Sequence, residues 1–180
     1  PCRECHGNGV VKTRKRLTLK IPAGVDTGSR LRLSGKGEGG LRGGAPGDLY
    51  VVLHVRPSTL FTRDGENLLC DVRVPLDIAI FGGQVSVPTL DGFAKITIPA
   101  GTQNGKIFRI RGKGVPELGT YQKGDILARV VIELPKNLSS SQKRKLKEFL
   151  DACGETNYPD TQSFQRLGET FLNYRKRKRK

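Results

Sequence analysis

Residues 21–55 read IPAGVDTGSRLRLSGKGEGGLRGGAPGDLYVVLHV, and this stretch occurs twice in the chain. Residues 98–132, IPAGTQNGKIFRIRGKGVPELGTYQKGDILARVVI, align with it without a gap at a constant offset of 77 residues. Twelve of the 35 aligned positions are identical, and five of these are glycines. Chance similarity does not keep one register over this length, so the sequence predicts two copies of one structural unit.

The pattern within each copy predicts β-strands. Apolar and polar residues alternate over residues 17–21 and 30–34, and this period of two is typical of a half-buried antiparallel sheet. Residues 49–53 form a continuous apolar run, which predicts a central strand, and residues 126–132 are its copy. The glycine-rich loop between these strands, residues 35–47, and its copy lack the P-loop spacing, so we expect wide turns rather than phosphate sites.

The second copy has an additional stretch upstream of it, residues 61–97. Strand-like runs at 68–74, 78–81 and 84–88 are followed in the chain by Asp91-Gly92, a pair that marks a tight hairpin. Subtracting the offset of 77 from the hairpin residues 89–92 gives residues 12–15, which come just after the first nine residues. We therefore expect the first copy to lack its opening strands in this chain.

After Pro135 the pattern changes from strands to helices. Ser139 and Gln142 have the spacing of a capping box, and the residues after them predict an amphipathic helix of about 13 residues that ends at Gly154. A second helix is expected with Ser163 as its N-cap. The apolar residues of the first helix are Leu146, Phe149, Leu150 and Cys153, and those of the second are Phe164, Leu167, Phe171 and Leu172.

The chain is strongly basic, and the charge is unevenly distributed. It has 32 lysines and arginines against 17 aspartates and glutamates, a formal net charge of +15. Residues 1–60 carry +7, residues 61–135 carry +1 and residues 136–180 carry +7, with a terminal basic run from Arg175 to Lys180. A basic nucleic-acid-binding β protein is the alternative function, but such proteins interleave aromatic with basic residues, whereas this chain has 6% aromatic residues and no tryptophan. We therefore expect no specific nucleic-acid partner.

The segment 2–9 has the form CxxCxGxG and begins with Cys2 and Cys5. Two thiolates at this spacing can grip one zinc ion from a tight turn, and they supply half of a tetrahedral site. The spacing by itself leaves a thioredoxin-like redox motif as an alternative. Cys70 and Cys153 stand apart, a cysteine usage typical of a reducing compartment rather than of a disulfide scaffold.

Taken together, these motifs resemble the zinc-finger-bearing DnaJ co-chaperones. The segments that carry the resemblance are CRECHGNG at 2–9, GAPGDLY at 44–50, FTRDGENL at 61–68, GGQVSVPTLDG at 82–92 and RGKGVP at 111–116. The resemblance covers residues 1 to about 153, and the chain looks like the part of such a protein from its last zinc repeat onward. The J domain of the family, with its His-Pro-Asp motif, is not in this sequence.

The resemblance implies a mainly β fold, in which two tandem β-sandwich-like domains are followed by a C-terminal helix that pairs two chains. It divides the chain into the last zinc repeat at 1–9, a truncated first C-terminal domain at 10–58, a second C-terminal domain at 59–135, a dimerisation helix at 136–154, and a second short helix with a basic tail at 155–180.

By this resemblance, the chain is a segment of a chaperone and not an enzyme. It would bind unfolded or misfolded polypeptides and, in the full protein, deliver them to a DnaK-type ATPase through the J domain, with roles in the heat-stress response and in DNA replication. Zn²⁺ is the implied cofactor, two ions per full-length chain, with Cys2 and Cys5 as the ligands present here. The implied peptide-binding residues are Leu17, Leu19, Leu33, Val51 and Leu53, each with ordinary core packing as the alternative, and the implied dimerisation residues are Leu146, Phe149 and Leu150.

No catalytic constellation competes with this interpretation. His54 lies in a strand pattern, and Asp48 and Asp125 each follow a glycine at a loop-to-strand boundary, where we expect them to stabilise turns. No apolar run approaches the ~18 residues that a membrane span needs, and no signal peptide is visible. We therefore expect a cytoplasmic protein without a membrane partner, and the resemblance implies that it is a homodimer.

Overall fold

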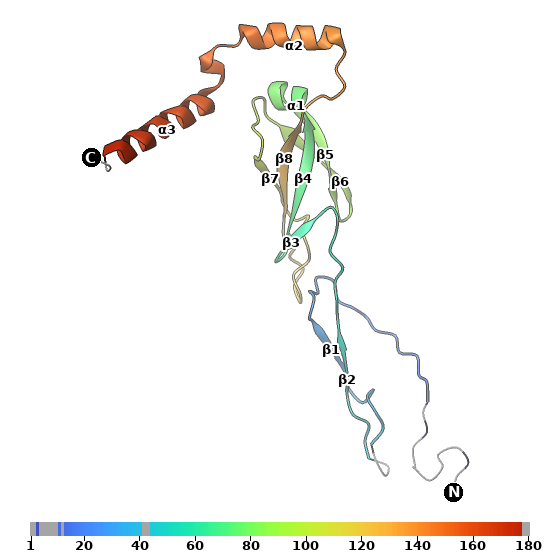
Figure 1. The fold of residues 1–180 in the computed structure, drawn as a ribbon. Helices are drawn as coiled ribbons and strands as arrows, with labels where there is room; N and C mark the ends of the chain where they lie inside the picture. The colour runs from blue at the N-terminus through green and yellow to red at the C-terminus, as the bar shows by residue number, and fades with distance from the viewer. Residues whose placement is uncertain (1–2, 4–10, 12, 41–43, 178–180) are drawn as a thin grey trace. The chain divides into compact units, whose positions relative to one another are not determined.

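The computed structural model describes residues 3, 11, 13–40 and 44–177. The chain divides into two compact units, residues 1–134 and 135–180, and each is considered by itself. The architecture is mainly β with helices at the C-terminal end, as the sequence predicts (Figure 1). In chain order the elements are β1 (Arg30–Leu33), β2 (Leu49–Val52), β3 (Thr62–Asp64), β4 (Asn67–Pro75), α1 (Leu76–Phe81), β5 (Gly83–Thr89), β6 (Gly92–Ile98), β7 (Ile107–Ile110), β8 (Ile126–Glu133), α2 (Ser140–Ala152), the 3-10 helix η2 (Glu155–Asn157) and α3 (Pro159–Arg177).

From here on, the second copy includes the stretch upstream of it, residues 61–97, and it folds around a four-stranded sheet in the order β3-β4-β8-β7. β8 lies between β4 and β7, which confirms the prediction of a central strand there, whereas β2, for which the same prediction was made, pairs only with β1 in the described part of the chain. The β4–β8 pair is parallel, which corrects the expectation of an antiparallel sheet. The connection between these strands contains α1, the β5–β6 hairpin and β7, and a connection of this length can return the chain to the end of the sheet where β4 began.

The duplication is visible in the strand pairing itself. Residues of β7 and β8 stand 77 positions after those of β1 and β2. Leu31 faces Val51 in the first copy, and Phe108 faces Ala128 in the second. Both pairs of strands are antiparallel and share one register, so the predicted repeat is confirmed in the hydrogen-bonded ladder.

The hydrophobic core lies in the second copy. Alternate residues of β4 and β8 point into it, and the β5–β6 hairpin adds Val87 and Ile98 to the same cluster. Thr89 pairs with Gly92 at the tip of that hairpin, which confirms the turn predicted at Asp91-Gly92. Among the described residues, every buried apolar side chain lies between positions 68 and 130; they are Leu68, Cys70, Val72, Val74, Ala79, Val87, Ile98, Ile126, Ala128 and Val130.

Residues 78–81 were expected to be strand-like, and this prediction is wrong. They belong to helix α1, which follows Pro75 at the end of β4 and buries Ala79. A short apolar run fits a buried helix as well as a strand, and its neighbours in the fold decide between them. The helix ends at Gly82, which has a φ of 82° and donates its amide hydrogen to the Ile78 carbonyl at 2.9 Å.

The first copy contributes the antiparallel pair β1–β2. Residues 17–21, where alternation predicted a strand, have no strand structure, and Leu17 and Ile21 are exposed. Alternation marks a segment that suits a sheet, but a strand also needs a neighbour that accepts and donates its backbone hydrogen bonds. In the described part of the chain, residues 17–21 have no such neighbour.

The C-terminal unit consists of helices. The predicted capping box is confirmed, because the Gln142 amide donates to the Ser139 hydroxyl and the Ser139 amide donates to the Gln142 side chain, and α2 has the predicted 13 residues. α3 begins at Pro159 rather than after Ser163, which corrects the predicted N-cap. Proline is favoured at the first helical position, and the Ser163 hydroxyl instead donates to the Pro159 carbonyl one turn earlier. Within the described residues, no helix has both the length and the apolar character needed to cross a bilayer.

Candidate functional site

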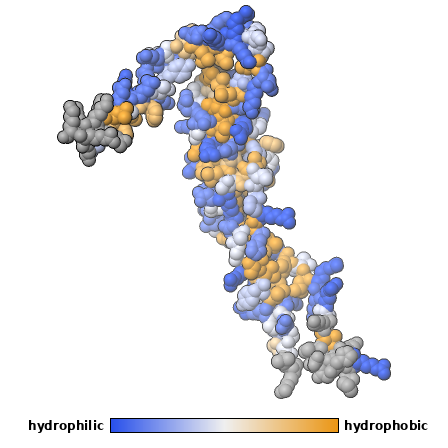
Figure 2. All heavy atoms as spheres, viewed as in Figure 1, coloured by the Kyte–Doolittle hydropathy of each residue, from blue (hydrophilic) through white to orange (hydrophobic). Residues whose placement is uncertain are grey.

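One face of the β1–β2 pair is apolar, and we call it the β1–β2 face. Its members are the half-buried residues Leu31, Leu33, Leu49, Val51 and Leu53. Side chains alternate across a strand, so Arg30, Arg32, Tyr50 and Val52 lie on the opposite face, where all four are exposed. The ladder continues one step past β2, because the Leu53 amide donates to the Ser29 carbonyl at 2.9 Å. Figure 2 shows apolar atoms, in orange, reaching the surface along these strands.

The second copy shows what usually covers such a face. The counterparts of the β1–β2 face are Phe108, Ile110, Ile126, Ala128 and Val130, and all of them belong to the core or pack against it. There, β4 pairs in parallel along the outer edge of β8 and places alternate apolar residues beside it. In the described part of the first copy, β2 has no neighbour equivalent to β4. The chemical complement of the β1–β2 face is therefore an extended strand with apolar residues at every second position.

Asp48 and Asp125 hold the turns that set these strands in register. The Gly35 amide donates to Asp48 at 2.9 Å, and the Gly112 amide donates to Asp125 at 2.8 Å. Asp48 also receives a hydrogen bond from Arg32, and Arg109 lies 3.6 Å from Asp125. The predicted turn-stabilising role of both carboxylates is confirmed, and the identical use in both copies belongs to the fold rather than to catalysis.

Arg63 joins the two copies. Its guanidinium donates to the carbonyls of Gly24 and Val25 at 2.8 and 2.7 Å and to the carbonyl of Gly65 at 2.8 Å. Gly24 itself has a φ of 90°, and a Cβ at this position would collide with the Pro116 carbonyl oxygen. The start of the first copy is thus held against two separate segments of the second, β3 and the loop before β8.

The structure brings together three of the five predicted peptide-binding residues. Leu33, Val51 and Leu53 lie on the β1–β2 face, whereas Leu17 is exposed and Leu19 half-buried in the segment without a strand. Leu31 and Leu49 belong to the same face but were not among the predicted site residues, although Leu31 stands in the same alternating segment as Leu33, and Leu49 in the same apolar run as Val51. Nothing in local spacing singles out Arg63, because its partners lie 38 and 39 residues away.

The predicted zinc ligands Cys2 and Cys5 lie outside the described residues. Within the described part of the chain, no three His, Cys, Asp or Glu side chains gather closely enough to hold a metal ion. Cys70 is buried in the core, where loss of solvation raises the pKa of its thiol above the ordinary value. Two thiolates leave half of a zinc tetrahedron unfilled, so a zinc site stays a prediction that needs further ligands.

The predicted dimerisation residues share one stripe of α2. Leu146, Phe149 and Leu150 have helical spacing and are 37%, 58% and 47% exposed. None of the residues of α2 is buried. The stripe is therefore available for a partner, and dimerisation itself stays a prediction.

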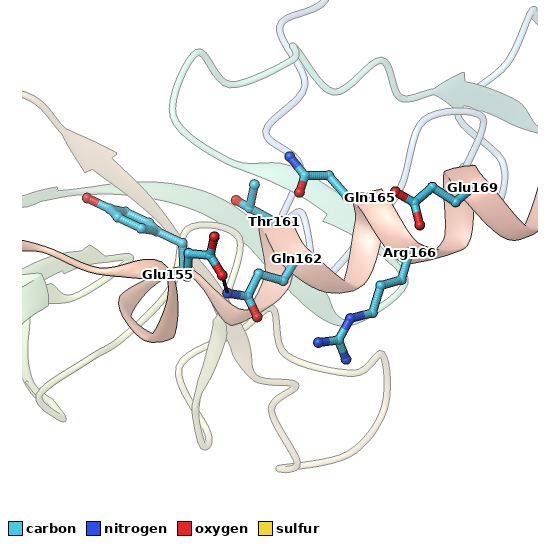
Figure 3. A pocket seen from close by; sticks show the side chains of 7 residues that line it. Glu155, Thr161, Gln162, Gln165, Arg166 and Glu169 are labelled. Carbon is cyan, nitrogen blue, oxygen red and sulfur yellow. Dashed lines mark hydrogen bonds between the residues drawn. The ribbon is translucent and has the colours of Figure 1, made fainter.

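A shallow groove of about 460 Å³ lies along η2 and α3 (Figure 3). It is lined mainly by polar side chains, among them Gln162, Gln165, Arg166 and Glu169, and the Gln162 amide donates to Glu155 at 3.3 Å. Most of these side chains are exposed, so the groove lacks the apolar walls of an ordinary ligand pocket.

Comparison with known proteins agrees with this arrangement. A family model described as the DnaJ C terminal domain matches residues 4–135. A chaperone protein DnaJ from Vesicomyosocius okutanii subsp. Calyptogena okutanii (strain HA) is 50% identical over 163 residues, which cover 91% of this chain and 45% of that protein. The chain thus spans a little less than half the length of this relative.

Proposed function

The chain belongs to the DnaJ C-terminal-domain family of chaperones, and from this membership we propose that it binds exposed apolar segments of unfolded polypeptides. The observation that carries the proposal is the β1–β2 face, five aliphatic side chains in register on a pair of strands whose outer edge at β2 has no described neighbour. Backbone groups of such an edge can pair with an extended peptide, and alternate peptide side chains then meet the apolar face.

The pairing of β4 with β8 suggests the geometry of the bound client. Leu68, Cys70 and Val72 face Ile126, Ala128 and Val130 across the parallel ladder. The equivalent residues in the first copy, 77 positions earlier, are Leu49, Val51 and Leu53. Alternate residues of a client that pairs with β2 in the same way would lie opposite these three. A client of this kind is an extended segment with apolar residues at positions i, i+2 and i+4, which unfolded β-strands expose.

Val51 and Val52 provide a matched test, because they are adjacent residues of the same type on opposite faces of β2. We expect Val51→Ser to weaken binding of a labelled peptide with alternating apolar residues by about tenfold, since a buried aliphatic side chain contributes roughly 1.5–3 kcal/mol. Val52→Ser should change the affinity little. Fluorescence anisotropy on the 180-residue chain measures both, with circular dichroism as the control for folding.

Equal effects of the two substitutions would show that the β1–β2 face is not the client site. Unfolding of the first copy by Val51→Ser alone would favour core packing instead. The same two variants in the full-length protein test whether the β1–β2 face binds a client or is covered by a strand from elsewhere in that protein. If Val51→Ser lowers peptide affinity only in the 180-residue chain, a strand of the full-length protein covers the face.

The whole-protein role extends this proposal. In the full protein, bound clients would pass to a DnaK-type ATPase during protein folding and heat stress, and Cys2 and Cys5 would hold zinc together with ligands from outside this chain. Two copies would pair through the α2 stripe, so that each dimer holds a client at two points and gains avidity. Phe149→Lys should then yield monomers by light scattering, while Asp151→Lys, on the opposite side of α2, should leave dimers.

A further inference from the structure

The outer side of the β1–β2 pair, opposite the β1–β2 face, carries cations and rings, and we call it the cationic face. Its members are Arg30, Arg32, Tyr50 and His54. Arg32 lies directly opposite Tyr50 in the ladder, and Arg30 lies opposite Val52. The Tyr50 side chain is 58% exposed, and the other three members are exposed as well. An open aromatic ring thus shares one short ladder with two guanidinium groups.

His54 belongs to this face because the ladder continues past the end of β2. The Val55 amide donates to the Thr27 hydroxyl at 3.0 Å, so the backbone stays paired on both sides of His54. Tyr50 and His54 are four residues apart on one side of an extended segment, which is about 13 Å along the chain. The cationic face therefore offers two separate rings to a ligand that runs along β2.

The positive charge of the cationic face is only partly neutralised. Asp48 accepts a hydrogen bond from Arg32, and the Asp48 side chain is only 24% exposed. In the part of the chain that the structure describes, neither Arg30 nor the exposed Arg56 forms an ion pair. Unpaired guanidinium groups suit phosphate, which they can hold through two parallel hydrogen bonds.

The second copy shows that the fold does not require this face. Aliphatic residues stand there at the positions of Arg30, Tyr50 and His54; they are Ile107, Leu127 and Val131. Both arginines on the equivalent side of β7 and β8 lie beside aspartates, so that side is close to neutral. The same antiparallel ladder thus forms without the rings and the unpaired cations, which leaves them available for a ligand in the first copy.

We propose that the cationic face binds single-stranded nucleic acid, RNA or DNA, without sequence preference. The unpaired guanidinium groups hold phosphates, and the rings of Tyr50 and His54 stack on bases, which every sequence presents. The low aromatic content of the whole chain does not oppose this, because rings and cations gather on one face. The exposed rings favour nucleic acid over an acidic polypeptide, which would need the cations alone.

Fluorescence anisotropy tests the proposal on the 180-residue chain, with labelled oligouridine and oligodeoxythymidine of about 20 nucleotides as probes. The tighter probe identifies RNA or DNA as the partner. Tyr50→Ala should weaken binding of that probe by about tenfold, because it removes a stacking ring. Tyr121→Ala, which removes an exposed ring from the second copy, is the matched control and should leave the affinity unchanged. Circular dichroism verifies that both variants are folded.

Salt dependence tests the phosphate contacts separately. Arg30→Gln should reduce the slope of log affinity against log salt concentration by about 0.7, the value for one phosphate of a single strand. Arg73→Gln removes the same charge from an exposed position of β4 and should leave the slope unchanged. Val51→Ser, on the opposite side of β2, should leave oligonucleotide binding unchanged, so the failure of client binding and the failure of this proposal are distinguishable.

Other results would overturn the proposal. If Tyr50→Ala binds as the unmodified chain does and removal of residues 175–180 abolishes binding, the nucleic acid binds the terminal basic run alone. If Arg30→Gln weakens binding of polyglutamate while Tyr50→Ala leaves oligonucleotide binding unchanged, the cationic face takes acidic polypeptides instead. Absence of binding to both probes at about 50 mM salt, where phosphate contacts are strong, would also overturn it.

Discussion

Leu31 on β1 lies directly opposite Val51 on β2, and both side chains are half-buried. Their copies, Phe108 and Ala128, face each other in the same register, but there Ala128 is fully buried. The local pairing is therefore the same in both copies, and the difference in burial comes from β4 and the β5–β6 hairpin, which cover the second copy.

Leu49 and Ile126 occupy equivalent positions in the two copies, so they compare these environments. Ile126→Ala should lower the free energy of unfolding by about 2–5 kcal/mol, because it leaves a cavity at a fully buried site. Leu49→Ala should cost clearly less, since its side chain is only half-buried. Urea unfolding followed by circular dichroism measures both. Equal losses would mean that the first copy contains a closed core.

The turn carboxylates give a second prediction. Asp125→Ala removes the acceptor of the Gly112 amide and should destabilise the second copy by about 1 kcal/mol, the usual net contribution of a hydrogen bond. Asp125→Asn keeps an oxygen acceptor at this position and should retain most of the stability. Thermal unfolding compares the two variants. An equal loss of stability in both variants would indicate that this carboxylate stabilises the fold through its ion pair with Arg109 rather than through the turn.

The contact that Arg63 makes between the two copies can be tested by substitution. Arg63→Lys keeps the charge but removes the planar fork, which makes three hydrogen bonds to three carbonyls. We expect faster chymotryptic cleavage after Leu60, in the irregular segment before β3, because the two copies are then less firmly joined. Arg73→Lys, at an exposed position of β4, is the control. An unchanged cleavage rate in Arg63→Lys would show that the joint does not depend on these bonds.

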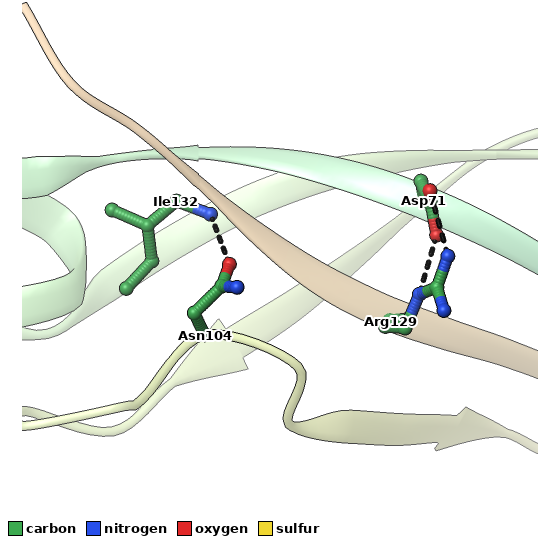
Figure 4. A network of polar contacts seen from close by, with 4 residues as sticks. All are labelled: Asp71, Asn104, Arg129 and Ile132. Carbon is green, nitrogen blue, oxygen red and sulfur yellow. Dashed lines mark hydrogen bonds and ion pairs between the residues drawn. The ribbon is translucent and has the colours of Figure 1, made fainter.

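Asp71 and Arg129 face each other across the parallel β4–β8 ladder, with two hydrogen bonds of 2.8 and 3.0 Å (Figure 4). The hydrogen bond from Arg129 lowers the pKa of the Asp71 carboxyl below its ordinary value. The unfolded chain therefore takes up this proton first as the pH falls, so the pair stabilises the fold above the ordinary aspartate pKa, and this contribution is lost as the pH falls through the lowered value.

Asp71→Asn should accordingly reduce stability near neutral pH by a small amount and flatten the pH dependence of stability in the acid range. Urea midpoints measured between pH 7 and about pH 3 follow both effects. Asp64→Asn, at an exposed position of β3, is the control. Parallel curves for Asp71→Asn and the unmodified chain would contradict the predicted linkage.

Local patterns were sufficient for several elements of the fold. The duplication, the hairpin at Asp91-Gly92, the capping box of Ser139 and Gln142, and the strands β4, β5, β7 and β8 were predicted from the sequence. These features depend on residues close together in the chain or on identity between the copies, and both are visible without coordinates. The family was likewise evident from motifs that stand in short segments.

Other features were decided by contacts between distant segments. The parallel direction of β4 against β8 depends on how a long connection crosses the sheet, and no local pattern encodes it. Helix α1 replaced an expected strand because the run of residues 76–81 packs Ala79 into the core. Arg63 meets Gly24 and Val25 only when the two copies fold against each other.

The candidate site combines both kinds of information. The family resemblance named Leu33, Val51 and Leu53, and the structure puts them on one side of a strand pair, because side-chain direction follows from the period of the backbone. Whether that side is covered depends on which other strands lie beside β2. That is a property of the tertiary structure, and for this reason residues that are identical in pattern are half-buried in the first copy and fully buried or packed against the core in the second.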